Sequence, residues 1–95
     1  MEAILTGIKC MELPNGMVSW TAKLMVGETL IHVVNEGNGG QTKLIGDRQI
    51  INELHDWAKK ELPDSFEPLE EIIDLADDND SLKDVVREMT LLRYF

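Results

Sequence analysis

The spacing of apolar residues changes once along the chain, and this change constrains the fold more than any other feature. Up to about residue 46, apolar residues recur at every second position, most regularly in the run Val18–Val26. From residue 47 onward they recur at every third or fourth position. A period of two is typical of a strand with one buried face, and a period of 3.6 is typical of an amphipathic helix. We therefore predict an α+β fold with a sheet-forming first half and a helical second half.

Three glycine-containing breaks divide the first half into four strands. The breaks are Leu13–Gly16, Gly27-Glu28 and Glu36–Gly40, and all three have the composition of hairpin turns. We predict a four-stranded antiparallel meander over residues 1–46. The run Thr29–Asn35 has apolar residues on both faces, which predicts a central strand that is covered on both sides.

The first strand alternates without interruption in the sequence. One face is expected to carry Ile4, Thr6, Ile8 and Cys10, and the other Leu5, Gly7, Lys9 and Met11.

The second half divides into two or three helices, which we expect to pack on one face of the meander. Asp47 is the predicted N-cap of the first helix, Pro63 ends it, Pro68 begins the second, and Ser81 precedes the third. The apolar stripes are Ile50, Ile51, Leu54, Trp57 and Ala58; Leu69, Ile72, Ile73 and Ala76; and Leu82, Val85, Val86, Met89 and Leu92.

Two details of the packing follow from these stripes. Trp20 and Trp57 lie on the apolar sides of a strand and a helix, and we expect both to be buried and to meet in the interface. The final segment 89–95 fits either the end of a helix or a last strand, and the pattern leaves both alternatives open.

Length and composition limit the class of protein. The 95 residues suit a single domain, 1–95, and contain no apolar run long enough for a membrane span. The N-terminus lacks the features of a secretory signal, and the single cysteine, Cys10, suits a reducing cytoplasm. A net charge of −9 argues against direct binding of nucleic acid.

The negative charge is concentrated in one segment. Residues 61–95 contain eleven acids and three bases, a net −8, and residues 61–80 contain nine acids and no base. Such a segment is either a solvated face that keeps the protein in solution or a surface that meets a basic partner. Under the second interpretation, the partner-binding residues are Asp64, Phe66, Glu67, Glu70, Glu71, Asp74, Asp77 and Asp78. We expect the helical acids among them to point outward.

Phe66 is the one aromatic residue inside this acidic segment. Exposed, it would anchor a partner with a basic and partly apolar surface. The alternative, which we favour on the general tendency of large apolar residues to be buried, is that it fastens the loop to the sheet.

A glycine-rich loop is the second candidate site. Its backbone amides and a neighbouring lysine are able to hold a phosphate-bearing ligand; the residues concerned are Gly37, Asn38, Gly39, Gly40 and Lys43. The sequence lacks the Gly-Lys-Ser/Thr of nucleotide-binding loops and the third glycine of dinucleotide-binding loops. A hairpin turn with glycines at positive φ explains the loop more simply.

Other chemistry is poorly represented. A calcium-loop register fits four residues, Asp77, Asn79, Ser81 and Glu88, but lacks the glycine that such a loop requires. Neither His32 nor His55 has a second metal-ligating residue at the spacing of a metal site. Cys10 lacks the surroundings of a nucleophile, and the carboxylate pairs have no apolar pocket to separate their pKa values. We expect no metal, no cofactor and no enzymatic activity.

The stretch from Trp20 to Gly40 consists of a strand, a tight Gly turn, a β-branched strand and Asn-Glu-Gly-Asn-Gly-Gly. It resembles small proteins from phages and mobile elements that carry an Asn-Asp/Glu-Gly-x-Gly-Gly loop. The resemblance covers less than a quarter of the chain and assigns no catalytic residue. It implies a small accessory protein of a phage or related element, a class whose members often bind and block a host factor.

Three functions are consistent with these features. The first is an interaction protein of the host cytoplasm, whose acidic segment inhibits a nucleic-acid-handling or defence protein by mimicking nucleic acid. The second is a protein that sequesters a nucleotide or phosphate ligand at the glycine-rich loop. The third is an assembly subunit, a homo-oligomer in which the sheet edge pairs with another copy.

Overall fold

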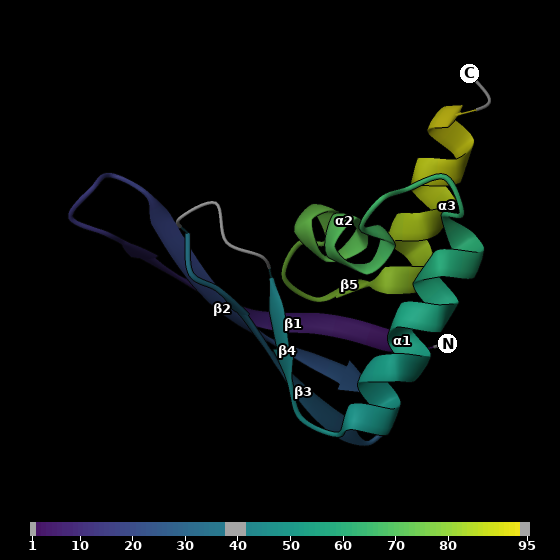
Figure 1. The fold of residues 1–95 in the computed structure, drawn as a ribbon, viewed down its shortest axis with the longest axis horizontal. Coiled ribbons are helices and arrows are strands. Elements are labelled where there is room, and N and C mark those ends of the chain that lie inside the picture. The colour runs from purple at the N-terminus through teal and green to yellow at the C-terminus, as the bar shows by residue number, and fades with distance from the viewer. Residues whose placement is uncertain (1, 38–41, 94–95) are drawn as a thin grey trace.

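The computed structural model describes residues 2–37 and 42–93 and confirms the α+β class (Figure 1). Its elements are β1 (Ala3–Glu12), β2 (Val18–Val26), β3 (Thr29–Asn35), β4 (Lys43–Ile45), α1 (Arg48–Glu61), α2 (Pro68–Leu75), β5 (Asp80–Ser81) and α3 (Leu82–Arg93). All strand pairs are antiparallel, and the order across the sheet is β4-β3-β2-β1-β5. The four-stranded meander is therefore confirmed.

The predicted hairpin turns hold the meander together. In the first turn Gly16 has φ +82°, and its amide donates to the carbonyl of Leu13 over 2.9 Å. In the second, Gly27 alone has a positive φ, +61°, and joins the paired residues Val26 and Thr29. Positive φ at the first central residue alone is the geometry that favours glycine there and suits the twist of the flanking strands.

A fifth strand completes the sheet and was not predicted. After α2 the chain reverses through Asn79, which has φ +72°, and Asp80–Ser81 pairs with Ile4 and Leu5 of β1. The amide of Asn79 also donates to the carbonyl of Leu5. A two-residue strand is too short to produce a periodic signal, and so the sequence shows only a helix break here.

A β-bulge in β1 overturns the expected alternation. The register with β2 shifts between Thr6 and Lys9, where Gly7 has φ +64°. The extra residue reverses the faces beyond it, so that Ile8 packs against the core while Ile4 is 43% exposed on the opposite face. The four residues predicted to share one face are thus divided between two.

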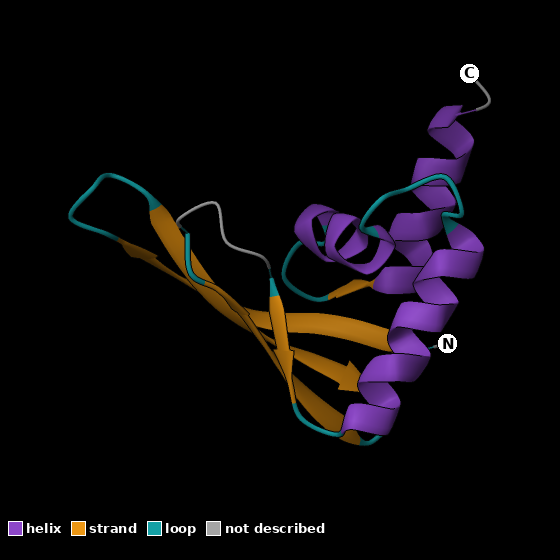
Figure 2. Cartoon of the chain, viewed as in Figure 1, coloured by secondary structure: helices purple, strands orange, loops and turns teal. Residues whose placement is uncertain are grey.

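The core lies between one face of the sheet and the three helices (Figure 2). Its largest fully buried side chains are Leu5, Leu24, Ile31, Val33, Leu54, Leu62, Leu69, Ile72, Ile73 and Leu82. The helical stripes are confirmed, except that the side chain of Leu92 lies outside the described part. The α1 cap is also as predicted, because Asp47 Oδ1 accepts from the amides of Gln49 and Ile50.

Two expectations about coverage are wrong. β3 is an interior strand between β4 and β2, but the helices cover only one of its faces and Leu30 on the other is 40% exposed. Trp20 and Trp57 are half-buried, not buried, and line separate depressions, beside α2 and α3 respectively. The two depressions share no lining residue, so the two indoles have separate surroundings.

The end of the described chain is helical. α3 continues to Arg93, which settles residues 89–93 as helix and leaves Tyr94 and Phe95 outside the described residues. Across the ranges 2–37 and 42–93, the helices lack the length and apolar character that a bilayer crossing requires.

Candidate functional site

Six of the eight predicted partner-binding residues lie together. The loop before α2 and the exposed side of α2 line one open depression of about 770 Å³. We call its lining the acidic surface: Asp64, Ser65, Phe66, Glu67, Glu70, Glu71, Asp74 and Leu75. Asp77 and Asp78 are exposed but lie beyond it, after the end of α2.

Phe66 is 94% exposed, so the expectation that it fastens the loop to the sheet is wrong. Leu62 and Leu69, at either end of the loop, are the residues that enter the core. With both ends anchored, the middle of the loop projects into solvent. Leu75, at the other end of the acidic surface, is also 57% exposed. The acidic surface therefore carries an apolar group at each end.

Two carboxylates of the acidic surface do not point outward as predicted. Glu70 and Glu71 are half-buried. Glu70 Oε1 accepts a hydrogen bond from the amide of Thr42 over 3.1 Å, and Glu71 Oε2 accepts one from the hydroxyl of Ser65. Their side chains thus support the loop before α2 and the start of β4, in addition to lining the surface.

Asp74 connects the acidic surface to an apolar neighbourhood. It also lines a second depression of about 370 Å³, together with Trp20, Ile73 and Asp77. Partial burial raises the pKa of Asp74, the negative charge of Glu70 raises it further, and a hydrogen bond from Thr42 opposes both effects. The expectation that no apolar surroundings separate the pKa values of the acidic pairs is therefore wrong at this residue.

The glycine-rich loop is described only at its ends, because Asn38, Gly39 and Gly40 lie outside the described residues. Gly37 has φ +81°, and a Cβ there would lie 2.5 Å from the Val18 carbonyl oxygen, so glycine is needed for the turn itself. Its amide donates to Asn35 Oδ1 over 2.9 Å.

The charge around this loop is also partly neutralised. Lys43 Nζ lies 3.2 Å from Glu36 Oε1, with both side chains exposed. Thr42 joins the loop to the acidic surface, because it accepts a hydrogen bond from Asn35 Nδ2 and donates its amide to Glu70. The carboxylates of Glu70, bonded to Thr42, and of Glu36, paired with Lys43, would repel a bound phosphate.

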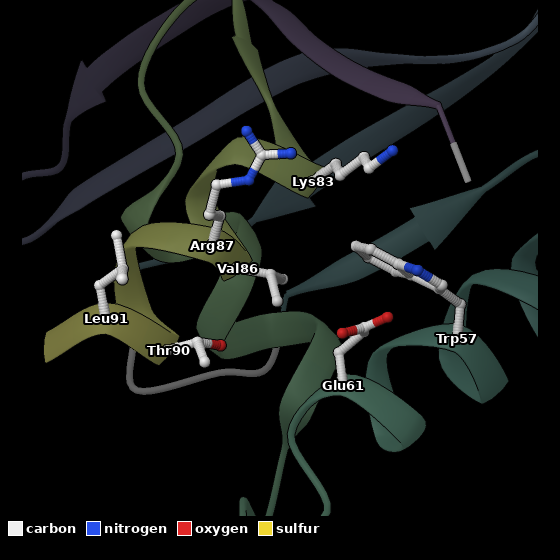
Figure 3. A pocket seen from close by; sticks show the side chains of 7 residues that line it. All are labelled: Trp57, Glu61, Lys83, Val86, Arg87, Thr90 and Leu91. Carbon is white, nitrogen blue, oxygen red and sulfur yellow. The ribbon is translucent and has the colours of Figure 1, made fainter. Parts of the chain in front are cut away.

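A groove between α1 and α3 was not found from the sequence. Trp57 and Glu61 extend from α1, and Lys83 and Arg87 from α3, into a depression of about 320 Å³ (Figure 3). Lys83 and Arg87 are four residues apart and so share a helix face, which is a signal the sequence contains. That Lys83 and Arg87 lie across the groove from Trp57 depends on how α1 and α3 pack, which a periodic pattern in the sequence does not predict.

The remaining candidates stay apart. His32 and His55 are exposed on β3 and α1, and Cys10 is exposed on β1. The calcium-loop register is occupied by a strand, since Ser81 belongs to β5. Over the residues that the structure describes, there is no group of three or more His, Cys, Asp or Glu side chains suited to a metal ion.

Comparison with protein families, curated proteins and solved structures finds no match for this chain.

Proposed function

We propose that this chain is a small interaction protein of phage type, which inhibits a host protein by occupying a basic surface with the acidic surface defined above. The host protein is one that handles nucleic acid or acts in defence. The observation that carries the proposal is Phe66, a nearly fully exposed aromatic side chain set among carboxylates.

Exposed aromatic residues are costly to leave in water and are enriched at the centres of interfaces. Phe66 therefore supplies the apolar anchor, while Asp64 and Glu67 on either side supply charge. The hydrogen bond from Ser65 to Glu71 holds the loop to α2, and that from Thr42 to Glu70 holds the start of β4 to α2, before a partner arrives. A surface ordered in advance loses less conformational entropy on binding.

The electrostatics of the acidic surface suit a partner that normally binds nucleic acid. Carboxylates spaced along α2 and its preceding loop imitate a row of phosphates. Nine acids without a base in residues 61–80 attract a basic groove over long range. Association is expected to be fast at low ionic strength and to slow steeply with added salt.

The experiment begins with a pull-down from host lysate, followed by binding measurements on the recovered partner. The test variant is Asp64→Asn, Phe66→Ala, Glu67→Gln, which spares the hydrogen-bonded Glu70 and Glu71. The matched control is Glu53→Gln, Asp56→Asn, which removes the same charge from exposed positions of α1. We expect the test variant to lose most affinity, the control to keep it, and nucleic acid to compete with the wild type. Equal binding by the two variants would contradict the proposal.

Ligand binding at the glycine-rich loop has weaker support. The Lys43–Glu36 pair and the contact of Thr42 with Glu70 place negative charge beside the loop. In a thermal-shift titration with nucleotides, we expect no stabilisation that depends on Lys43.

A further inference from the structure

The sheet has a second face that no described element covers. Residues directly opposite each other in antiparallel strands point to the same side, and so the register assigns every side chain to a face. The uncovered positions form rows across the strands: Ser81, Ile4, Met25 and Leu30; Thr6, Lys23, His32 and Ile45; Lys9, Thr21, Val34 and Lys43; Met11 and Ser19. We call this set the open face.

The open face is apolar and cationic, in contrast to the rest of the chain. None of the positions that the described register assigns to it is Asp or Glu. Of its three lysines, Lys43 is paired with Glu36, so Lys9 and Lys23 supply its positive charge. Its apolar side chains are only partly shielded, with Ile45 56% and Leu30 40% exposed. Contiguous exposed apolar side chains of this kind mark interaction sites more often than chance exposure does.

The open face is also hollowed. A depression of about 410 Å³ is lined mainly by Gly7, Lys9, Thr21, Lys23, His32, Val34 and Ile45. Gly7 contributes no side chain, and the nearest atom to a Cβ built there is Lys23 Cδ at 3.9 Å, so the bulge leaves this side of the depression free. The bulge also turns Lys9 onto the open face, beside Thr21. The result is an apolar floor with lysines around it.

We propose that the open face binds the acidic surface of a second copy of this chain, with Phe66 in the depression and Asp64 and Glu67 against Lys9 and Lys23. The proposal rests on the acidic surface being a docking surface, as the proposed function also requires. The two surfaces are complementary in charge, and the one supplies an exposed aromatic group where the other supplies an apolar hollow.

A second copy suits the open face better than nucleic acid does. Single-stranded nucleic acid is bound on sheets by aromatic side chains that stack on the bases, and the register places none on this face. A chain of net charge −9 also repels phosphates at long range. The acidic surface of the same copy is not available either, because α2 packs on the opposite, helix-covered face of the sheet (Figure 2).

The contact is heterologous, since two different surfaces meet. Each added copy leaves one acidic surface and one open face unused, so assembly extends head to tail or closes into a ring. Each contact also hides one acidic surface. Self-association therefore competes with binding of the basic host partner.

Sedimentation of the wild-type chain is the first test. We expect the average mass to rise with protein concentration at low ionic strength. The mass should fall towards that of the 10.8 kDa chain near about 1 M salt, where charges are screened within about 3 Å. A chain that stays monomeric at low salt up to millimolar concentration would overturn the proposal.

Mixing two disabled variants is the sharper test. Lys9→Glu, Lys23→Glu disables the open face, and Asp64→Lys, Phe66→Ser, Glu67→Lys disables the acidic surface. Each variant alone should associate roughly tenfold or more weakly than the wild type. An equimolar mixture retains one working surface of each kind and should form a 1:1 dimer that does not grow. A mixture that remains monomeric, with both variants folded by circular dichroism, would refute the head-to-tail contact.

Lys59→Glu, Lys60→Glu is the control, because it makes the same charge change at exposed positions of α1. It should associate like the wild type, and equal weakening there would overturn the proposal. The open-face variant also separates the two proposals, since it should still bind the recovered host partner. Loss of self-association alone by that variant supports this inference. A wild type that binds the partner but never self-associates sinks the inference and leaves the proposed function standing.

Discussion

The open face and the acidic surface are built from different secondary structure and have opposite charge. The open face consists of alternate residues of extended strands, which bring lysines and β-branched or long apolar side chains onto one side. The acidic surface consists of a loop and one helix. The apolar residues of the helix face the core, and the carboxylates and Phe66 line the outer side. The sheet and the core lie between them.

The net charge of −9 therefore does not represent the local charge of either the open face or the acidic surface. In a strand, successive residues point to opposite faces. In a helix, residues three or four positions apart share a face. A chain that changes from one period to the other therefore presents two unrelated surface compositions on one small fold. Binding behaviour is expected to follow the local charge of each surface more than the total.

The largest effect should come from the covered side of the sheet. Leu24 is fully buried, whereas Leu30 on the neighbouring strand is on the open face. We expect Leu24→Ala to lower the free energy of unfolding by about 2–5 kcal/mol, a large part of the stability of a small domain. Leu30→Ala should cost less than about 1 kcal/mol, because little apolar area leaves the core. Urea denaturation of the two variants measures the difference. Similar losses of stability would mean that the side chain of Leu30 is covered and not exposed on the open face.

The bulge should have the next largest effect. Gly7 is in the left-handed region and its Cβ position is unobstructed. Gly7→Ala should therefore cost about 1–2 kcal/mol through backbone conformation alone. Deletion of Gly7 should cost less than Gly7→Ala, since it removes the extra residue and leaves Ile8 opposite Ala22 on the core face. Denaturation midpoints rank the two variants, and a deletion variant much less stable than Gly7→Ala would show that Gly7 is not the extra residue of the bulge.

On the acidic surface, the hydrogen-bonded carboxylates should differ from the free ones. Glu70→Ala removes the acceptor of the Thr42 amide and should cost about 1 kcal/mol. Glu67→Ala, at an exposed position, should change stability by less than about 0.5 kcal/mol. Thermal unfolding at neutral pH provides the comparison. A stabilising Glu70→Ala would mean that relief of charge repulsion outweighs the hydrogen bond.

The helical layer was predictable because each helix has both a stripe and a boundary signal. Asp47 and Pro68 stand where the helices begin, and the predicted stripes are the residues that reach the core. The meander was predictable for the same reason, since Gly16 and Gly27 mark turns.

Most of the predictions that failed have a different cause. They concern features that are set by contact with a segment far away in the sequence. The strand β5 exists because β1 has a free edge near Leu5. The bulge at Gly7 is set by the register with β2. Phe66 is the local exception, since Leu62 and Leu69, within four residues of it, fill the core and leave it exposed. The position of the acidic residues was readable from the sequence, whereas the inward turn of Glu70 was not, because Thr42 lies 28 residues earlier.

The smallest expected effect concerns Asp74, where the acidic surface meets the apolar side of α2. Burial and the neighbouring Glu70 raise its pKa above the ordinary 3.8. The folded state therefore holds the proton more tightly than the unfolded state, and stability falls as pH rises from 3.8 through the raised pKa. Asp74→Asn removes this loss, so the variant should be slightly more stable than the wild type at neutral pH, within about 0.5 kcal/mol because the residue is largely exposed. The advantage should vanish below pH 3.8, where both states of the wild type are protonated. Unfolding curves of both proteins across this pH range measure it, and an advantage that grows as the pH falls would show that the sign is wrong.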